Sequence, residues 1–389
     1  MGCRQPKKIK IGILIHEGRF VEAQALVPEF DEKDLEENSD WLRTLAEIEL
    51  ATGNRRGGAS KLMKLGGHDI DTCELVLEYV GLLCRYGCLL EADLLAQISI
   101  ARTIGSRSFE LHRHDIHQML LELHKHGFAA EALEHCKQML SHDEHPNWKK
   151  LFCFLSYGQE KLGDHVLETQ AYHEQYPADE DFADFYVAAL RQAGRRSDLL
   201  REVRRLKAQF PNHPLFAGEL GLMHVESKDT VKALNVARLL LEQLGDRHMA
   251  LHYAGLIAHL CGDMALSNAA FAKLPLHSPF YLNDRKLYAA NLMAQHEFNE
   301  AQQVLARVSY YQPGHPQLLG LQMLAAWGLQ DRATFLQNKS RLLAHYSGLG
   351  PRERLKELTF YFSVARQAFD EGAYQSLVTE FEADFVDWI

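Results

Sequence analysis

Several patterns that would indicate a secreted or membrane-spanning protein are missing from this sequence. No CxxC pair occurs among its seven cysteines, and an odd number of thiols in a chain of 389 residues argues against a disulfide framework. The apolar stretch at residues 9–15 contains a lysine and a glycine, and it is too short to span a bilayer. We therefore expect a cytoplasmic protein without a membrane span.

An excess of positive charge and a linker are also missing. The chain has 42 basic and 52 acidic side chains, a net charge of −10, whereas a general nucleic-acid binder must neutralise phosphates. No stretch is rich in Ser, Gly or Pro, and no β-type alternation of apolar and polar residues persists beyond a few positions. We expect one continuous domain, residues 1–389.

Catalytic signatures are missing as well. Neither an HExxH zinc motif nor a GxSxG nucleophile elbow occurs. The segment GNRRGGASK, which begins at Gly53, has glycines and a lysine but not the spacing of a phosphate-binding loop. The sequence therefore predicts a protein that is not an enzyme and that needs no cofactor.

What the sequence does contain is a repeated helical hairpin. An apolar helix ends at a turn residue, where glycine relieves the left-handed conformation, and a small residue follows five positions later, where the two helices cross most closely. Turns at Gly194, Lys228, Gly262 and His296 follow one another at intervals of 34 residues. Such a period is the signature of a repeat array. The turn and small residues pair as Gly18 with Ala23, Gly53 with Gly58, Gly87 with Ala92, Gly127 with Ala132, Gly194 with Leu199, Lys228 with Ala233, Gly262 with Ser267, and His296 with Ala301.

Three hairpins in the middle of the chain carry apolar, glycine, alanine and proline landmarks at matching positions. These residues resemble the 34-residue pattern of the tetratricopeptide repeat family. The resemblance implies an all-α, right-handed solenoid of about eleven antiparallel helix pairs, best registered over residues 180–313, with capping helices over residues 352–389. The landmarks are Leu220, Gly221 and Ala233, then Leu251, Ala254, Gly255, Gly262, Phe271 and Pro279, then Tyr288, Ala289, Ala301, Leu305 and Pro313.

Two units depart from this pattern. The turn that we assign to Gly163 has Glu168 at its small position, and the unit over residues 316–346 has Phe335 there. The C-terminal residues FEADFVDWI mix acidic and aromatic side chains, which suits a cap on the last helix pair or a docking tail.

In this family, peptide ligands usually lie in the concave groove lined by the first helices. By that resemblance the chain is a non-catalytic scaffold or adaptor within a multiprotein assembly, and its partner is a protein or peptide with a helical or extended apolar segment. Part of the groove could instead be covered by the chain's own next turn. Lys286 followed by Ala290 departs from the family's carboxylate-binding variant. The lining positions are Leu215, Gly218, Leu222, Val225, Met249, His252, Leu256, His259, Asn283, Lys286, Ala290 and Met293.

A histidine-rich helix leaves a second function open. His114, His117 and His124 share one helix face, and imidazole binds metals and titrates near neutrality. A regulator that responds to a metal or a peptide is therefore an alternative. A polar groove lining is the simpler interpretation, because a closed zinc site needs three or four converging ligands.

A basic cluster leaves a third function open, that of an RNA-binding helical array. Asp198 and Glu202 lie at helical spacing from these arginines, which favours an ordinary solvated face. The acidic balance of the whole chain also argues against nucleic acid as the ligand. The cluster consists of Arg191, Arg195, Arg196, Arg201, Arg204 and Arg205.

Overall fold

The computed structural model describes residues 4–27, 39–68, 73–104, 109–276, 278, 280–311, 315–346 and 351–385. These residues form 22 α-helices and one short 3-10 helix, and they contain no strand. Cys3 and the last four residues of the C-terminal tail lie outside the described residues. None of the described helices combines the length and the apolar character that crossing a membrane requires.

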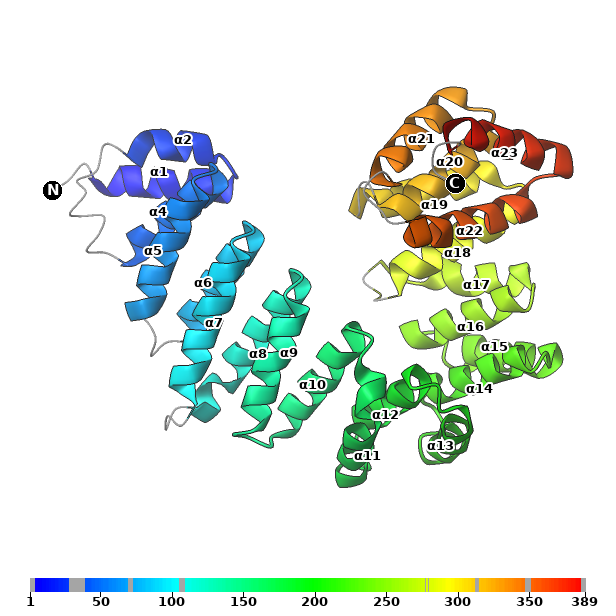
Figure 1. The fold of residues 1–389 in the computed structure, drawn as a ribbon, viewed down its shortest axis with the longest axis horizontal. Helices are drawn as coiled ribbons and strands as arrows, with labels where there is room; N and C mark the ends of the chain where they lie inside the picture. Colours follow the sequence, from blue (N-terminus) through cyan, green and yellow to red (C-terminus); the bar gives the residue numbers. More distant parts are fainter. Residues whose placement is uncertain are drawn as a thin grey trace. The chain divides into compact units, whose positions relative to one another are not determined.

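The helices form eleven consecutive antiparallel pairs, which confirms the all-α helical-repeat prediction (Figure 1). The first helices of the pairs are α1 (Arg4–His16), α4 (Ser39–Ala51), α6 (Cys73–Arg85), α8 (Phe109–Lys125), α10 (Pro146–Gly158), α12 (Glu180–Gln192), α14 (Pro214–Glu226), α16 (His248–Leu260), α18 (Tyr281–Ala294), α20 (Pro316–Gly328) and α22 (Pro351–Ala368). The second helices are α2 (Phe20–Leu26), α5 (Arg55–His68), α7 (Leu89–Thr103), α9 (Ala129–Leu140), α11 (Val166–Gln175), α13 (Arg196–Gln209), α15 (Thr230–Gln243), α17 (Met264–Lys273), α19 (Phe298–Tyr311), α21 (Arg332–Tyr346) and α23 (Glu371–Phe385).

The chain divides into two compact units, Met1–Leu199 (unit 1) and Leu200–Ile389 (unit 2). Within each unit, neighbouring first helices pack together, as α6 does on α8 and α14 on α16. Each hairpin therefore buries its apolar face against the next one, as expected for a repeat array. That residues 1–389 form one continuous domain stays a prediction.

The turns keep a more regular register than the glycines suggest. The residue with positive φ is a glycine in six turns, and it is Glu160, Lys228, His296 or Gln330 in four others, with φ between 57° and 62°. From Glu160 to Gln330 the turn residues recur every 34 positions without interruption. The best-registered region therefore extends beyond residues 180–313 on both sides.

The assignment of a turn to Gly163 is wrong. The left-handed residue is Glu160, and a 3-10 helix, Leu162–His165, precedes α11. The N–H of Gly163 donates a hydrogen bond to Gln192 Oε1 at 3.2 Å, and a Cβ at this position would lie only 2.7 Å from the backbone nitrogen of Ala193. The glycine at position 163 is therefore needed because the end of α12 packs directly on the backbone there, and not because of a left-handed turn.

The position five residues after the turn is buried as expected. Ala92, Ala233 and Ala301 have no exposed surface at the helix crossings. In the α20–α21 hairpin the same position is Phe335, which is also completely buried, with its ring centroid 4.9 Å from that of Trp327. This hairpin therefore accommodates a large side chain where most of the others have a small one.

Candidate functional site

Apolar side chains of α14 and α16 lie at the predicted groove positions in unit 2. Leu215, Leu222 and Val225 of α14 and Met249 and Leu256 of α16 are all half-buried. The first four pack against the small core that these two hairpins share, and α14 contacts α16 directly. The five residues, which we call the α14–α16 strip, form an apolar surface that is partly open to water.

The two predicted groove histidines in α16 form side-chain hydrogen bonds with residues of α18. The Nδ1–H of His252 donates to the Asp284 carboxylate, with distances of 2.8 and 3.0 Å to its oxygens, and its ring stacks on Phe280 with centroids 4.3 Å apart. Asp284 has no exposed surface, and its burial raises the pKa of the carboxyl, which the hydrogen bond from His252 partly opposes. The Nδ1–H of His259 donates to Asn291 Oδ1 at 2.7 Å. Both rings therefore hold neighbouring repeats together.

Similar hydrogen bonds connect α16 to α14 and α18 to α20. Tyr253 Oη donates to Glu219 Oε1 of α14 at 2.9 Å, and Lys286 Nζ of α18 donates to Gln317 Oε1 of α20. Together with the His252–Asp284 and His259–Asn291 bonds, these four are the inter-repeat links. Each joins residues 31 to 34 positions apart, so each connects one hairpin to the next.

The predicted groove does not continue openly along α18. Met293 is completely buried and belongs to the core around α18, α20 and α22, and Lys286 retains only 9% of its surface. The reason is that α22 packs on both α18 and α20 (Figure 1). Tyr361 of α22 lies against Gly320 of α20. Of the predicted α18 positions, Asn283 is exposed. Met293 and Lys286 are therefore wrong as lining residues of an open groove.

The basic cluster is largely neutralised by local acids. Arg195 pairs with Asp198 at 2.5 Å, and Arg201 and Arg205 pair with Glu202 at 3.4 and 2.8 Å. Both pairs of Glu202 lie within α13, and Arg195 lies just before this helix, so all three pairs form between residues that are close in the sequence. Arg191, Arg196 and Arg204 are exposed.

The histidines of α8 separate toward different neighbours. His114 is exposed, the ring of His117 lies 6.2 Å from that of Trp148, and the ring of His124 lies 5.5 Å from that of Phe154. Burial lowers the pKa of His117, and His114 adds to this effect, so the neutral ring is favoured. In the described parts of the chain, no three His, Cys, Asp or Glu side chains converge in a metal-binding arrangement.

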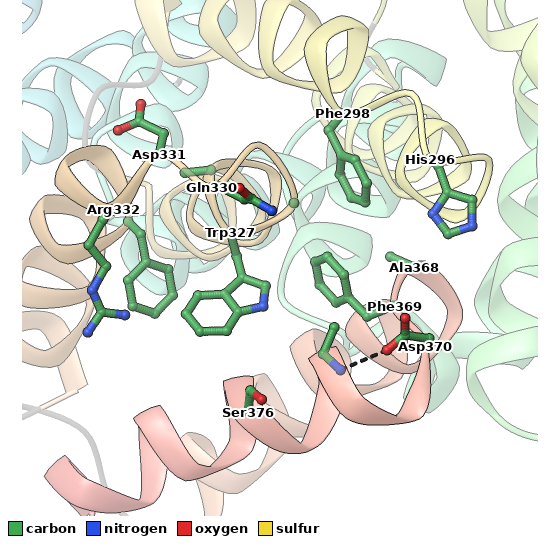
Figure 2. A pocket seen from close by; sticks show the side chains of 14 residues that line it. His296, Phe298, Trp327, Gln330, Asp331, Arg332, Ala368, Phe369, Asp370 and Ser376 are labelled. Carbon is green, nitrogen blue, oxygen red and sulfur yellow. Dashed lines mark hydrogen bonds between the residues drawn. The ribbon is translucent and has the colours of Figure 1, made fainter.

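A cavity of about 510 Å³ that the sequence did not indicate lies where three turns of unit 2 meet (Figure 2). Its walls come from the α18–α19, α20–α21 and α22–α23 turns. The rings of Phe298 and Phe369 stack on one side with centroids 5.5 Å apart, and Trp327 lies opposite them. We call this cavity the Trp327 pocket.

Polar groups surround the aromatic walls of the Trp327 pocket. Asp370 Oδ1 accepts the Ala373 N–H at 2.8 Å and so caps the N-terminus of α23. Arg332 pairs with Glu380 at 2.5 Å while its guanidinium lies over Phe335, 5.4 Å from the ring centroid. This combination of flat apolar walls and a polar rim suits a large apolar side chain from another molecule. Aromatic residues beside three successive turns were the available signal in the sequence.

A charged groove, about 610 Å³ in volume, lies on the first helices of unit 1. The repeat pattern is most regular in the later hairpins, and it gives no indication of this groove. Within it Arg43 pairs with Glu78 at 2.7 Å, and Glu122 lies 3.5 Å from both Lys125 and His126. The groove is formed by α4, α6 and α8.

Comparisons with known proteins concern the fold. No protein-family model matches the chain, and no curated protein sequence matches it. Among solved structures, the chain is similar to the TPR domain of P58(IPK), with 14% identity over 94% of this chain and 99% of that chain and a TM-score of 0.32. It is also similar to yeast Tom70, with 11% identity over 97% and 84% of the two chains and a TM-score of 0.40, and to the pentatricopeptide repeat protein PPR10 from maize, with 11% identity over 97% and 58% and a TM-score of 0.38. The assignment to helical-repeat proteins rests on the eleven helix pairs themselves.

Proposed function

We propose that this protein is a non-catalytic scaffold that binds an apolar segment of a protein partner on the α14–α16 strip, within a multiprotein assembly. The observation that carries the proposal is the strip itself, in which Leu222 and Leu256 occupy equivalent positions of successive first helices and are only half-buried. A helical or extended segment laid across them would remove the remaining apolar surface from water. Six free cysteines among the described residues suit a reducing compartment such as the cytoplasm.

Geometry also favours this part of unit 2 over the α18 end. There α22 already covers the first-helix face, so a partner would have to displace a core that contains Met293 and Tyr361. The inter-repeat links hold α14, α16 and α18 in a fixed relation, which reduces the ordering cost when a partner binds. The net acidity of the chain and the ion pairs of its arginine cluster make protein a better ligand than nucleic acid.

The Trp327 pocket supplies a second contact in the same unit. A large apolar side chain that enters it would meet Trp327, Phe298 and Phe369. Buried aromatic anchors of this kind commonly contribute most of the energy of a protein interface.

The test begins with a partner identified by in-cell crosslinking and mass spectrometry, whose binding to the purified chain is then measured by calorimetry. The variants Leu222→Glu and Leu256→Glu place a charge in the strip, and we expect each to weaken binding at least tenfold, since burying a charge opposite apolar surface is costly. The matched control is Val231→Glu on α15, where the wild-type side chain is 72% exposed. Circular dichroism must show that all three variants keep their helix content.

Equal binding by wild type and both strip variants would refute the α14–α16 strip as the site. Equal losses in Val231→Glu would show that added negative charge alone weakens binding, which would also refute it. Trp327→Ala then tests the second contact, because it removes one wall of the pocket without touching the strip.

A further inference from the structure

A second cavity in unit 1 points to a ligand that the apolar strip would not bind. It measures about 530 Å³ and lies between the α4–α5 and α6–α7 turns and His126, the residue that follows α8. Among the described residues that line it, the charged side chains are Arg55 and Arg85, with His126 beside them and no carboxylate. This is the reverse of the overall charge of the chain, which is −10. We infer that this cavity, the Arg55–Arg85 pocket, binds a phosphate group.

The two arginines differ from those arginines of this protein that are paired with acidic side chains. Arg43, Arg113 and Arg332, for example, each pair with a carboxylate within 3.0 Å. Neither Arg55 nor Arg85 forms an ion pair with another described residue, although both line the same cavity. Two guanidinium groups offer planar sets of donors that match the oxygens of a phosphate.

The backbone around the pocket adds to this preference. Arg55 reaches across to the next turn, where its Nη1 lies 3.8 Å from the place that a Cβ on Gly87 would occupy. The following helix, α7, begins at Leu89, which lines the pocket, and its N-cap residue Cys88 makes no side-chain hydrogen bond to the first-turn amides. An uncapped helix N-terminus carries partial positive charge and free N–H donors.

Carboxylates lie close by, but most of them are already paired. Glu122 lies 3.5 Å from both Lys125 and His126, and Glu78 pairs with Arg43 in the neighbouring charged groove. Glu47 also lines that groove, which shares Arg85 and His126 with the pocket. A doubly charged oxyanion is therefore favoured over a carboxylate, because it gains more from two arginines than a single charge does.

The experiment titrates inorganic phosphate into the purified chain at constant ionic strength and pH 7.5, with binding followed by calorimetry. We expect saturable binding by the wild type and a loss of about tenfold in affinity for Arg55→Gln and for Arg85→Gln, since each removes charge-assisted hydrogen bonds. The control is Arg56→Gln, which removes the same charge from the adjacent residue of α5; Arg56 is exposed, as Arg55 and Arg85 are, but it does not line the pocket. Arg56→Gln should bind phosphate as the wild type does.

Two further titrations identify the source of the phosphate. Phosphoserine binding more tightly than inorganic phosphate supports a phosphorylated peptide as the ligand, and equal binding supports the free ion. Acetate serves as the carboxylate probe, and acetate binding as tightly as phosphate would overturn the inference. So would the absence of saturable phosphate binding by the wild type, or an equal loss in Arg56→Gln, which would indicate only a diffuse effect of net charge.

Discussion

Lys228 provides a test of the turn register, because glycine and alanine should have reversed effects at this position. Lys228 follows α14 with φ at 61°, and its side chain is exposed. A residue with a Cβ costs about 1–2 kcal/mol in this left-handed conformation, whereas glycine adds only about 0.5–1 kcal/mol of lost chain entropy. Lys228→Gly should therefore be about 0.5–1 kcal/mol more stable than Lys228→Ala. In the middle of a right-handed helix, glycine would be about 1 kcal/mol less stable than alanine.

The two variants remove the same charge, so their difference isolates the backbone conformation. Repeat arrays can open one hairpin at a time, and for that reason the measurement is amide hydrogen exchange in α14 and α15 rather than a single melting temperature. Slower exchange in Lys228→Gly than in Lys228→Ala is the expected result. If Lys228→Ala exchanged more slowly, the left-handed turn at this position, and with it the 34-residue register of turn residues, would be refuted.

Two further predictions concern one buried and one half-buried side chain. Phe335→Ala should destabilise the α20–α21 hairpin by about 3–5 kcal/mol in urea unfolding, because it leaves a cavity beside Trp327. The control Leu336→Ala, at a neighbouring side chain that is 43% exposed, should change the stability little. An unchanged stability in Phe335→Ala would contradict the packing of Phe335 on Trp327. Burial raises the pKa of Asp184 to about 8, so the folded chain keeps a proton that the unfolded chain releases near pH 4. The free energy of unfolding should accordingly fall between pH 4 and 8, by at most about 1.4 kcal/mol per pH unit from this group. In urea unfolding, Asp184→Asn should reduce this dependence of the unfolding free energy on pH, whereas Glu174→Gln at an exposed position should not. An unchanged pH dependence in Asp184→Asn would count against the raised pKa.

Much of the fold could be predicted because its rules are local. The turn residue, the small residue five positions later and the 34-residue interval all act within one hairpin, so they can be recognised in the sequence. The errors arose where a glycine can have more than one structural purpose, or where a residue other than glycine takes the left-handed conformation. Gly163 looked like a turn but serves the close approach of α12, while Glu160 takes the left-handed conformation without being a glycine.

The candidate site could be predicted only where it depends on one helix face. The predicted apolar positions on α14 and α16 are half-buried, as helical periodicity leads one to expect, whereas Gly218 is buried against Tyr253; that these positions line a groove stays a prediction. Met293 was misplaced because its burial depends on α22, which follows about 60 residues later in the chain. The Trp327 and Arg55–Arg85 pockets each combine residues from three hairpins, and no spacing within a single repeat reveals them.

The inter-repeat links make this stretch of unit 2 a series of joints, each between two adjacent hairpins. Each of the four hydrogen bonds connects only adjacent hairpins, so the bending compliance of the stretch is the sum of the contributions of its separate joints. The α16–α18 joint has the links His252–Asp284 and His259–Asn291. The α14–α16 joint has the link Tyr253–Glu219 and a further hydrogen bond from Arg247 to the carbonyl of Asn212, just before α14. The apolar strip therefore lies across a joint that is fixed by hydrogen bonds and by close helix packing, so the spacing between α14 and α16 should change little when a torque acts along these hairpins.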